Sequence, residues 1–184
     1  MTKRFFLALL IGSFVIGAAV GQVGYPQATA APVTRGIVVL TPIGSSHAAG
    51  RVYFTPSGTS MKVTGTIIGL TPGMHGIHVH TYGDLTDQSK GASAGSHYNP
   101  TNMPHGRPQD RRRHVGDMGN ITANAQGRSY FAVTIPRMSL NGRYGIIGRG
   151  LVIHSGADKF TQPDGNAGAR VAFGVIGYAN PTTK

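Results

Sequence analysis

The chain has 184 residues, no cysteine and a formal net charge of +11, with 17 Lys and Arg residues against 6 acidic ones. The absence of cysteine excludes disulfides, thiolate chemistry and cysteine-ligated zinc sites. The length fits one packed domain, and the charge favours anions in general without selecting one partner.

The N-terminal segment has a basic start followed by an apolar run. Lys3 and Arg4 precede the uncharged residues 5–20, and small residues follow, which is typical of a secretory signal peptide. The run is only slightly short of a membrane span, so an uncleaved anchor is the alternative. We therefore expect a signal peptide or anchor over residues 1–30, a domain over residues 31–184, and export of the protein, either secreted or held at a membrane.

The rest of the chain predicts strands. Glycine and proline separate short runs rich in β-branched and aromatic residues, at residues 35–40, 50–55, 61–70, 76–82, 117–122, 129–135, 149–154 and 170–178. Two polar segments without periodicity, residues 83–114 and 155–169, are expected to be long functional loops. The predicted fold class is all-β: an eight-stranded flattened Greek-key barrel or sandwich, immunoglobulin-like in type.

Six of the eight histidines form one array. Alternate residues of a strand point to the same face, so His78 and His80 present two imidazoles side by side. Alone, such a pair is more often two solvated histidines than half a metal site. The following segment adds three imidazoles and one carboxylate, from His97, His105, His114 and Asp117. That set suits tetrahedral zinc, so the array predicts two metal sites.

Five short motifs follow one another along the domain. They are GIHVH at residues 76–80, AGSHYNP at 94–100, RHVGD at 113–117, GNAGAR at 165–170 and GVIG at 174–177. In this order they resemble the copper/zinc superoxide dismutase family, over about residues 36–179. The resemblance implies one copper and one zinc per subunit.

The resemblance also implies a role for each member of the array. The copper ligands would be His78, His80, His97 and His154. The zinc ligands would be His97, His105, His114 and Asp117, so that His97 bridges the two metals. Asp158 would accept hydrogen bonds from His78 and His105, and His75 would position the neighbouring backbone without binding metal.

The implied activity is the dismutation of superoxide to dioxygen and hydrogen peroxide, with copper as the redox metal. His97 and Arg170 would be the catalytic residues. His97 would leave copper and take up a proton, while Arg170 would hold the anion through charge-assisted hydrogen bonds. Without the histidines, Arg170 would be interpreted as a surface residue. The alternative function is non-enzymatic copper or zinc binding or delivery on the same scaffold.

The chain departs from the family in its scaffold. Gly91 and Phe173 occupy the positions of the family's disulfide. Burial of Phe173 is expected to replace that bond, by about 1.5–3 kcal/mol from hydrophobic transfer alone. The loop at residues 155–169 is shorter than in the family and lacks its glutamates and lysine, so guidance of the anion must come from elsewhere.

Two further features concern partners. Arg111, Arg112 and Arg113 form a basic run with three alternative interpretations. It raises the anion potential near the site, it is a solvated charge run without a function, or it binds a polyanion such as a heparin-like glycan. The run is short and has no interleaved aromatic residues, so a specific nucleic-acid reader is not expected. Residues 174–179 resemble the family's two-fold contact and predict a homodimer, and Asn120 begins a glycosylation sequon.

Overall fold

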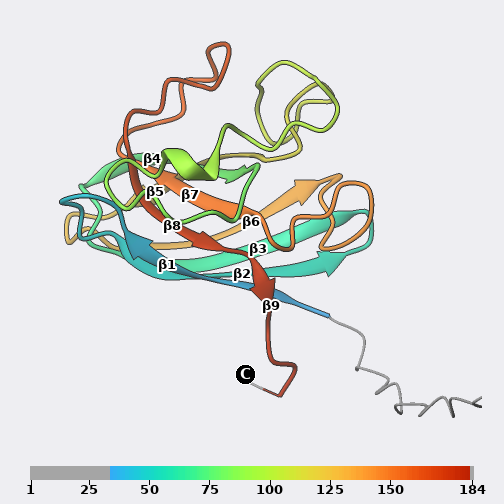
Figure 1. The fold of residues 1–184 in the computed structure, drawn as a ribbon, viewed down its shortest axis with the longest axis horizontal. Helices are drawn as coiled ribbons and strands as arrows, with labels where there is room; N and C mark the ends of the chain where they lie inside the picture. Colours follow the sequence, from blue (N-terminus) through green and yellow to red (C-terminus); the bar gives the residue numbers. More distant parts are fainter. Residues whose placement is uncertain (1–33, 183–184) are drawn as a thin grey trace, which may run out of the picture. The chain divides into compact units, whose positions relative to one another are not determined.

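The computed structural model describes residues 34–182, which fold almost entirely into strands and loops (Figure 1). The strands are β1 (Gly36–Pro42), β2 (Ala49–Ser57), β3 (Ser60–Ile68), β4 (Gly73–His80), β5 (Asp117–Ala123), β6 (Ser129–Pro136), β7 (Gly150–His154), β8 (Arg170–Val175) and β9 (Gly177–Tyr178). Within the described range, the helical structure consists of one 3₁₀ turn, η1 (Ala92–Ala94). The all-β class is confirmed, and the last of the eight expected strands is divided into β8 and β9.

The predicted leader, residues 1–30, lies outside the described residues, as does the expected start of the domain at residue 31. Over residues 34–182, no helix has the length and apolar character needed to cross a bilayer. The division of the chain into leader and domain stays a prediction.

Eight antiparallel strands form two facing sheets. Their hydrogen-bonded order is β5-β4-β7-β8-β1-β2-β3-β6, and β9 pairs with β1 outside this path. Strand β1 joins the two sheets, because it pairs with β2 along most of its length and with β8 only at Thr41 and Pro42. The arrangement is the expected flattened barrel, with β1, β2, β3 and β6 in one wall and β4, β5, β7 and β8 in the other (Figure 1).

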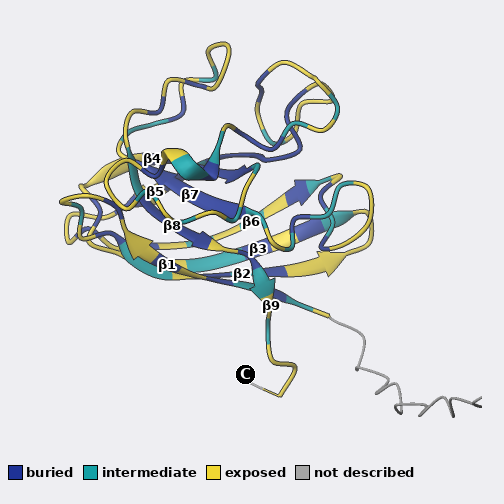
Figure 2. Ribbon diagram, in the orientation of Figure 1, coloured by how far each residue is buried: buried dark blue, intermediate teal, exposed yellow. Residues whose placement is uncertain are grey.

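The core lies between the two sheets and follows from alternation along each strand. On β2, the alternate residues Val52 and Phe54 are buried, whereas Arg51, which precedes Val52, is exposed. Strand β4 is different, because its last six residues are all buried (Figure 2). Ile77 and Val79 belong to the core between the sheets. The alternate residues of β4 therefore face the opposite side, where the long loops cover them.

A second, smaller apolar cluster holds the first long loop against the sheet. Val152 and Phe173 are paired neighbours on β7 and β8, and they pack with Ile43 and with Ala94 and Leu85 of the loop. Phe173 is fully buried, as predicted. At Gly91, opposite, a Cβ would lie 2.8 Å from Ile43 Cδ1, and φ is +68°. The two positions that the resemblance assigns to a disulfide, Gly91 and Phe173, therefore both lie beside Ile43.

Substituting Phe173→Ala is expected to lower the free energy of unfolding by about 3–5 kcal/mol, because it leaves a cavity in this cluster. Denaturant unfolding of the metal-free protein measures the loss. A matched control is Tyr130→Ala on β6, where the side chain is 65% exposed, and this change should stay within about 0.5 kcal/mol. A loss for Phe173→Ala no larger than that of the control would contradict the role given to the cluster.

Candidate metal centre

The two long loops lie over the outer face of the sheet that contains β4 and β7 (Figure 1). Main-chain hydrogen bonds fix the first loop along β4: Val79 N–H donates to Gly116 O at 2.9 Å, and Tyr98 N–H donates to Val79 O at 2.8 Å. A Cβ at Gly116 would lie 2.2 Å from Val79 O, so the approach requires glycine. These contacts place His97 opposite His80 in an isolated antiparallel bridge.

A first group of four buried histidines gathers beneath the loops. It contains His78 and His80 of β4, His97 of the first loop and His154 of β7, and each offers one ring nitrogen within 4.8 Å of the others. Three of these atoms, Nδ1 of His78, Nε2 of His80 and Nε2 of His154, have no hydrogen-bond partner. Unpaired buried nitrogens are costly, and a bound cation would satisfy them together.

The opposite ring nitrogens of the same histidines are all occupied. His78 Nε2 donates to Asp158 Oδ2 at 2.9 Å, His80 Nδ1 to Gly95 O at 2.8 Å, and His154 Nδ1 to Gly168 O at 3.1 Å. Carbonyl and carboxylate oxygens only accept, so these nitrogens carry the ring hydrogen of the neutral imidazole. The lone pairs of the unpartnered nitrogens are thereby directed at one another.

A second group joins His97, His105 and His114 to Asp117. Their Nδ1 atoms lie 3.1, 2.9 and 3.1 Å from Asp117 Oδ1. The other carboxylate oxygen, Oδ2, accepts main-chain hydrogen bonds from Gly106 at 3.0 Å and His114 at 2.9 Å. His105 Nδ1 has no partner of hydrogen-bond geometry despite its short distance to Asp117. Three nitrogens and one oxygen therefore converge on one point, as the ligands of a tetrahedral cation do.

His97 belongs to both groups and lies between them. Its ring stacks on His78, with centroids 4.0 Å apart, and its centroid is 5.1 Å from that of His80. On the other side, its centroid lies 5.3 Å from that of His105 and 5.5 Å from that of His114. His97 is thus the one residue common to the two groups.

Asp158 connects the two groups from the second long loop. Besides the bond from His78, its carboxylate accepts a hydrogen bond from His105 Nε2, at 3.0 Å to Oδ1. The main-chain N–H of Phe160 also donates to Oδ1, at 2.8 Å. A Cβ at Gly165 would lie 2.0 Å from the same oxygen, so this residue too must be glycine. One buried carboxylate therefore orients a histidine of each group.

Two side-chain amides that the sequence did not single out hold the second loop in place. Gln162 accepts from His105 N–H at 2.9 Å and donates to His105 O at 2.8 Å. Asn120 makes the same reciprocal pair with the main chain of Asp158, at 2.7 and 3.0 Å. The Asn120 amide is thus engaged with the loop, which does not favour glycosylation. Its sequon was the only sequence signal at either position.

Arg170 and His75 both lie beside His154. Arg170 pairs with His154 across β7 and β8, and its guanidinium donates to Gly95 O at 2.6 Å and to Gly91 O. The ring of His75 lies between His154 O, at 2.7 Å, and Thr71 O, at 2.8 Å. His75 is outside both ligand groups, and it contacts the backbone of a member of the first group.

The basic run does not form one exposed surface. Arg111 and Arg112 are exposed, but Arg113 is buried, with 4% of its surface exposed. The Arg113 guanidinium donates to main-chain oxygens of Pro108 at 2.9 Å, His114 at 2.6 Å, Val115 at 3.0 Å, and Pro136. Arg113 therefore ties the first loop to the end of β6 and does not join Arg111 and Arg112 at the surface.

Comparison with known proteins now bears on this geometry. Residues 48–176 match the sequence model of the family described as copper/zinc superoxide dismutase. The chain is also 41% identical to the extracellular superoxide dismutase [Cu-Zn] of Onchocerca volvulus over 157 residues, which are 79% of this chain and 76% of that protein. The chain belongs to the copper/zinc superoxide dismutase family. The expected family, superoxide-dismutating enzyme class and pair of metals are confirmed.

The two groups of this superoxide dismutase centre differ in electrostatics. Burial lowers the pKa of His78 to about 3 and that of His154 to about 4, and it holds the pKa of His80 well below its ordinary value. Burial acts the same way on His105, but the carboxylates of Asp117 and Asp158 outweigh it and raise its pKa to about 9. For both acids, burial is outweighed by hydrogen bonds from histidines, which lower the pKa.

The metal-free protein is expected to be most stable near pH 6.5. Below this pH, His78 and His154 become protonated in the unfolded chain, whereas in the folded protein they stay neutral down to about pH 3 and 4. The free energy of unfolding therefore decreases as the pH is lowered. Above it the unfolded chain loses the proton that folded His105 keeps up to about pH 9, so stability falls again. Each group contributes up to about 1.4 kcal/mol per pH unit.

Urea unfolding of the metal-free protein at about pH 5, 6.5 and 8.5 measures this dependence. The midpoint concentration should be highest at the middle pH. Equal midpoints at the two lower pH values would contradict the neutral state of the first group of histidines.

Proposed function

We propose that this superoxide dismutase binds copper at His78, His80, His97 and His154 and zinc at His97, His105, His114 and Asp117. Four imidazoles suit Cu(II), and three imidazoles with one carboxylate suit a closed zinc site. Copper supplies, when bound, the one-electron redox change that both halves of the dismutation need. The observation that carries the assignment is the convergence of ring nitrogens in two groups that share His97, with three unpartnered nitrogens in the first group and one in the second.

The reaction converts two superoxide anions and two protons into dioxygen and hydrogen peroxide. His97, at its Nε2 atom, is proposed to take up one of these protons and to deliver it to the peroxide, because its Nδ1 faces the second group. Arg170 is proposed to orient the anion. Burial is the main cause that lowers the pKa of His80 and His154, and the positive charge of Arg170 is a smaller one. The charge of Arg170 therefore reaches the first group, where an anion would approach.

The substitution His154→Ala tests the assignment. It removes one of the four imidazoles of the first group, so copper binding should weaken and superoxide removal should fall to the rate without enzyme. The assay uses protein loaded with copper and zinc, with metal content measured on the same sample. His47→Ala is the matched control, because His47 is exposed and outside both groups, and it should retain full activity.

Retained activity in His154→Ala would contradict the copper assignment. A wild-type protein that binds both metals but removes superoxide no faster than free copper would instead favour the metal-delivery alternative.

Export is proposed on two grounds. The relative from Onchocerca volvulus is described as extracellular. The first residues of this chain have the basic and then apolar layout of a secretory signal. The proposal covers both secretion and retention at a membrane by an uncleaved segment.

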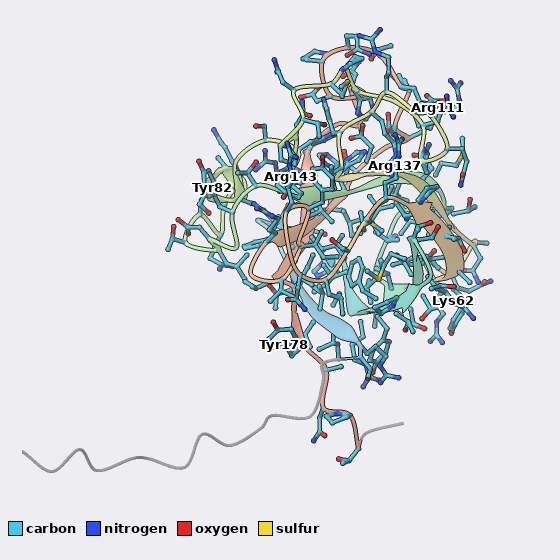
Figure 3. The ribbon with its side chains drawn as sticks, turned by 90° about the vertical axis from the view of Figure 1, so that its right-hand side faces the viewer. Lys62, Tyr82, Arg111, Arg137, Arg143 and Tyr178 are labelled. Carbon is cyan, nitrogen blue, oxygen red and sulfur yellow. The ribbon has the colours of Figure 1, made fainter. Side chains whose placement is uncertain are left out.

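A homodimer is proposed on the basis of an exposed apolar patch over β1, β8, β9 and the start of the first loop. The patch consists of Val39, Tyr82, Val175 and Tyr178, which are 61%, 59%, 38% and 53% exposed. A Cβ at Gly83 would lie 3.1 Å from Val175 Cγ1, and one at Gly174 would lie 2.2 Å from Val39 O, so these segments are contiguous. Figure 3 shows Tyr82 and Tyr178 on the side away from Lys62. Such a patch typically marks a protein interface.

Val39→Asp should weaken the dimer by at least about tenfold, because it places a charge at the centre of the patch. Sedimentation velocity over a range of protein concentrations measures the dissociation constant. Tyr130→Asp is the control, since Tyr130 is about as exposed as Val39 but lies on β6, three positions from β1 in the strand order. Equal dissociation constants for the two variants would exclude this patch as the interface.

A further inference from the structure

A hollow of about 240 Å³ lies beside the metal centre, between the first long loop and the segment that follows β6. It is lined by Met103, Arg111, Arg113, Val115, Arg137 and Tyr144. Figure 3 shows Arg111 and Arg137 next to one another at the loop-bearing end of the domain, with Arg143 on the same face. Neither the metals nor the proposed dimer uses this hollow.

Two of the three arginines around the hollow are held in place by main-chain oxygens. Arg113 is bound by four carbonyl groups, as described above, and Arg137 donates to the carbonyls of Asp110 and Arg111, both at 2.6 Å. Carbonyl contacts orient a guanidinium without neutralising it. Burial, followed by the charge of Arg137, lowers the pKa of Arg113, so two like charges lie within interaction range.

Within residues 34–182, no carboxylate lies at ion-pair distance from these arginines. The ion pairs in this part of the described chain each join a histidine of the metal centre to Asp117 or Asp158. Asp110 and Asp117 act on Arg113 only as weaker, longer-range attractions. The hollow therefore concentrates positive charge that an anion would neutralise.

The remaining wall of the hollow is mostly apolar, although Thr101 also contributes to it. Met103 is 37% exposed, Val115 is buried, and the half-buried ring of Tyr144 has the Arg143 guanidinium 5.5 Å from its centre. An inorganic anion alone would leave this wall in water. A ligand that joins an oxyanion to a compact ring would use both parts of the site, and the volume is near the lower end for small-molecule sites.

We propose that this hollow binds the sulfate or phosphate ester of a sugar, with the oxyanion at Arg111 and Arg137 and the ring against Met103 and Tyr144. Guanidinium groups donate paired hydrogen bonds to such oxyanions. The site replaces the predicted polyanion surface: Arg137, distant in sequence, takes the place of Arg112, which does not line the hollow. It does not depend on the proposed metal assignment.

The test is an NMR titration of the full metal-loaded protein with glucose 6-sulfate and glucose 6-phosphate. Glucose and inorganic sulfate are the two half-ligand controls. At least one ester should bind about tenfold or more tightly than either half, and the shifted resonances should include Tyr144 and Val115. The tighter of the two esters identifies the source, a sulfated glycan or a phosphorylated sugar. Inorganic sulfate binding as tightly as both esters would overturn the proposal.

Variants localise the site. Arg111→Gln and Arg137→Asn should each weaken ester binding by about tenfold and leave superoxide removal unchanged. Asparagine suits position 137 because φ there is +55°. The charge-matched control is Arg51→Gln, an exposed residue of β2, which should retain binding. An equal loss in Arg51→Gln would show attraction by net charge alone and overturn the proposal, as would unchanged affinity in both hollow variants.

Discussion

The metal centre depends on one kind of hydrogen bond, which His78, His80, His105 and His154 donate from the ring nitrogen that faces away from their ligand group. The acceptors are Asp158 and the carbonyls of Gly95 and Gly168, which all belong to the long loops. Each bond sets a ring tautomer and so directs a lone pair inward. The loops therefore do more than cover the site, because without their acceptors the strands would present histidines of undefined orientation.

Holding those loops falls to several weak contacts instead of one covalent bond. Phe173 packs the first loop onto the sheet, Gln162 joins it to the second loop, and Asn120 fixes the second loop to β5. Arg113 adds a tie to the end of β6. A disulfide acts largely by restricting the unfolded chain, whereas these contacts act in the folded state. The chain thus gains order at the site without dependence on the redox conditions around it.

Much of this was predictable where a pattern repeats or a spacing is specific. Alternation indicated the strands, and the histidine spacing together with the family resemblance indicated both ligand groups. The reciprocal amide pairs of Gln162 and Asn120 were not predictable, because a side chain that bonds to distant main chain leaves no periodic signal. The burial of Arg113 was not predictable for the same reason. Its partners are main-chain carbonyls, such as that of Pro136, and every residue type has such a carbonyl. The hollow at Arg137 depends likewise on contacts between segments remote in sequence.

The two faces of strand β4 belong to two different buried regions. Ile77 and Val79 complete the core between the sheets, and the histidines that alternate with them complete the metal centre. A rigid strand cannot shift one set without the other, so the packing of the core sets the separation of the ligand nitrogens. Metal binding in turn raises the free energy of unfolding of the whole barrel, because a cation that binds only the folded state stabilises that state by mass action. Folding and metal uptake in this enzyme are therefore coupled equilibria, so a change in one shifts the other.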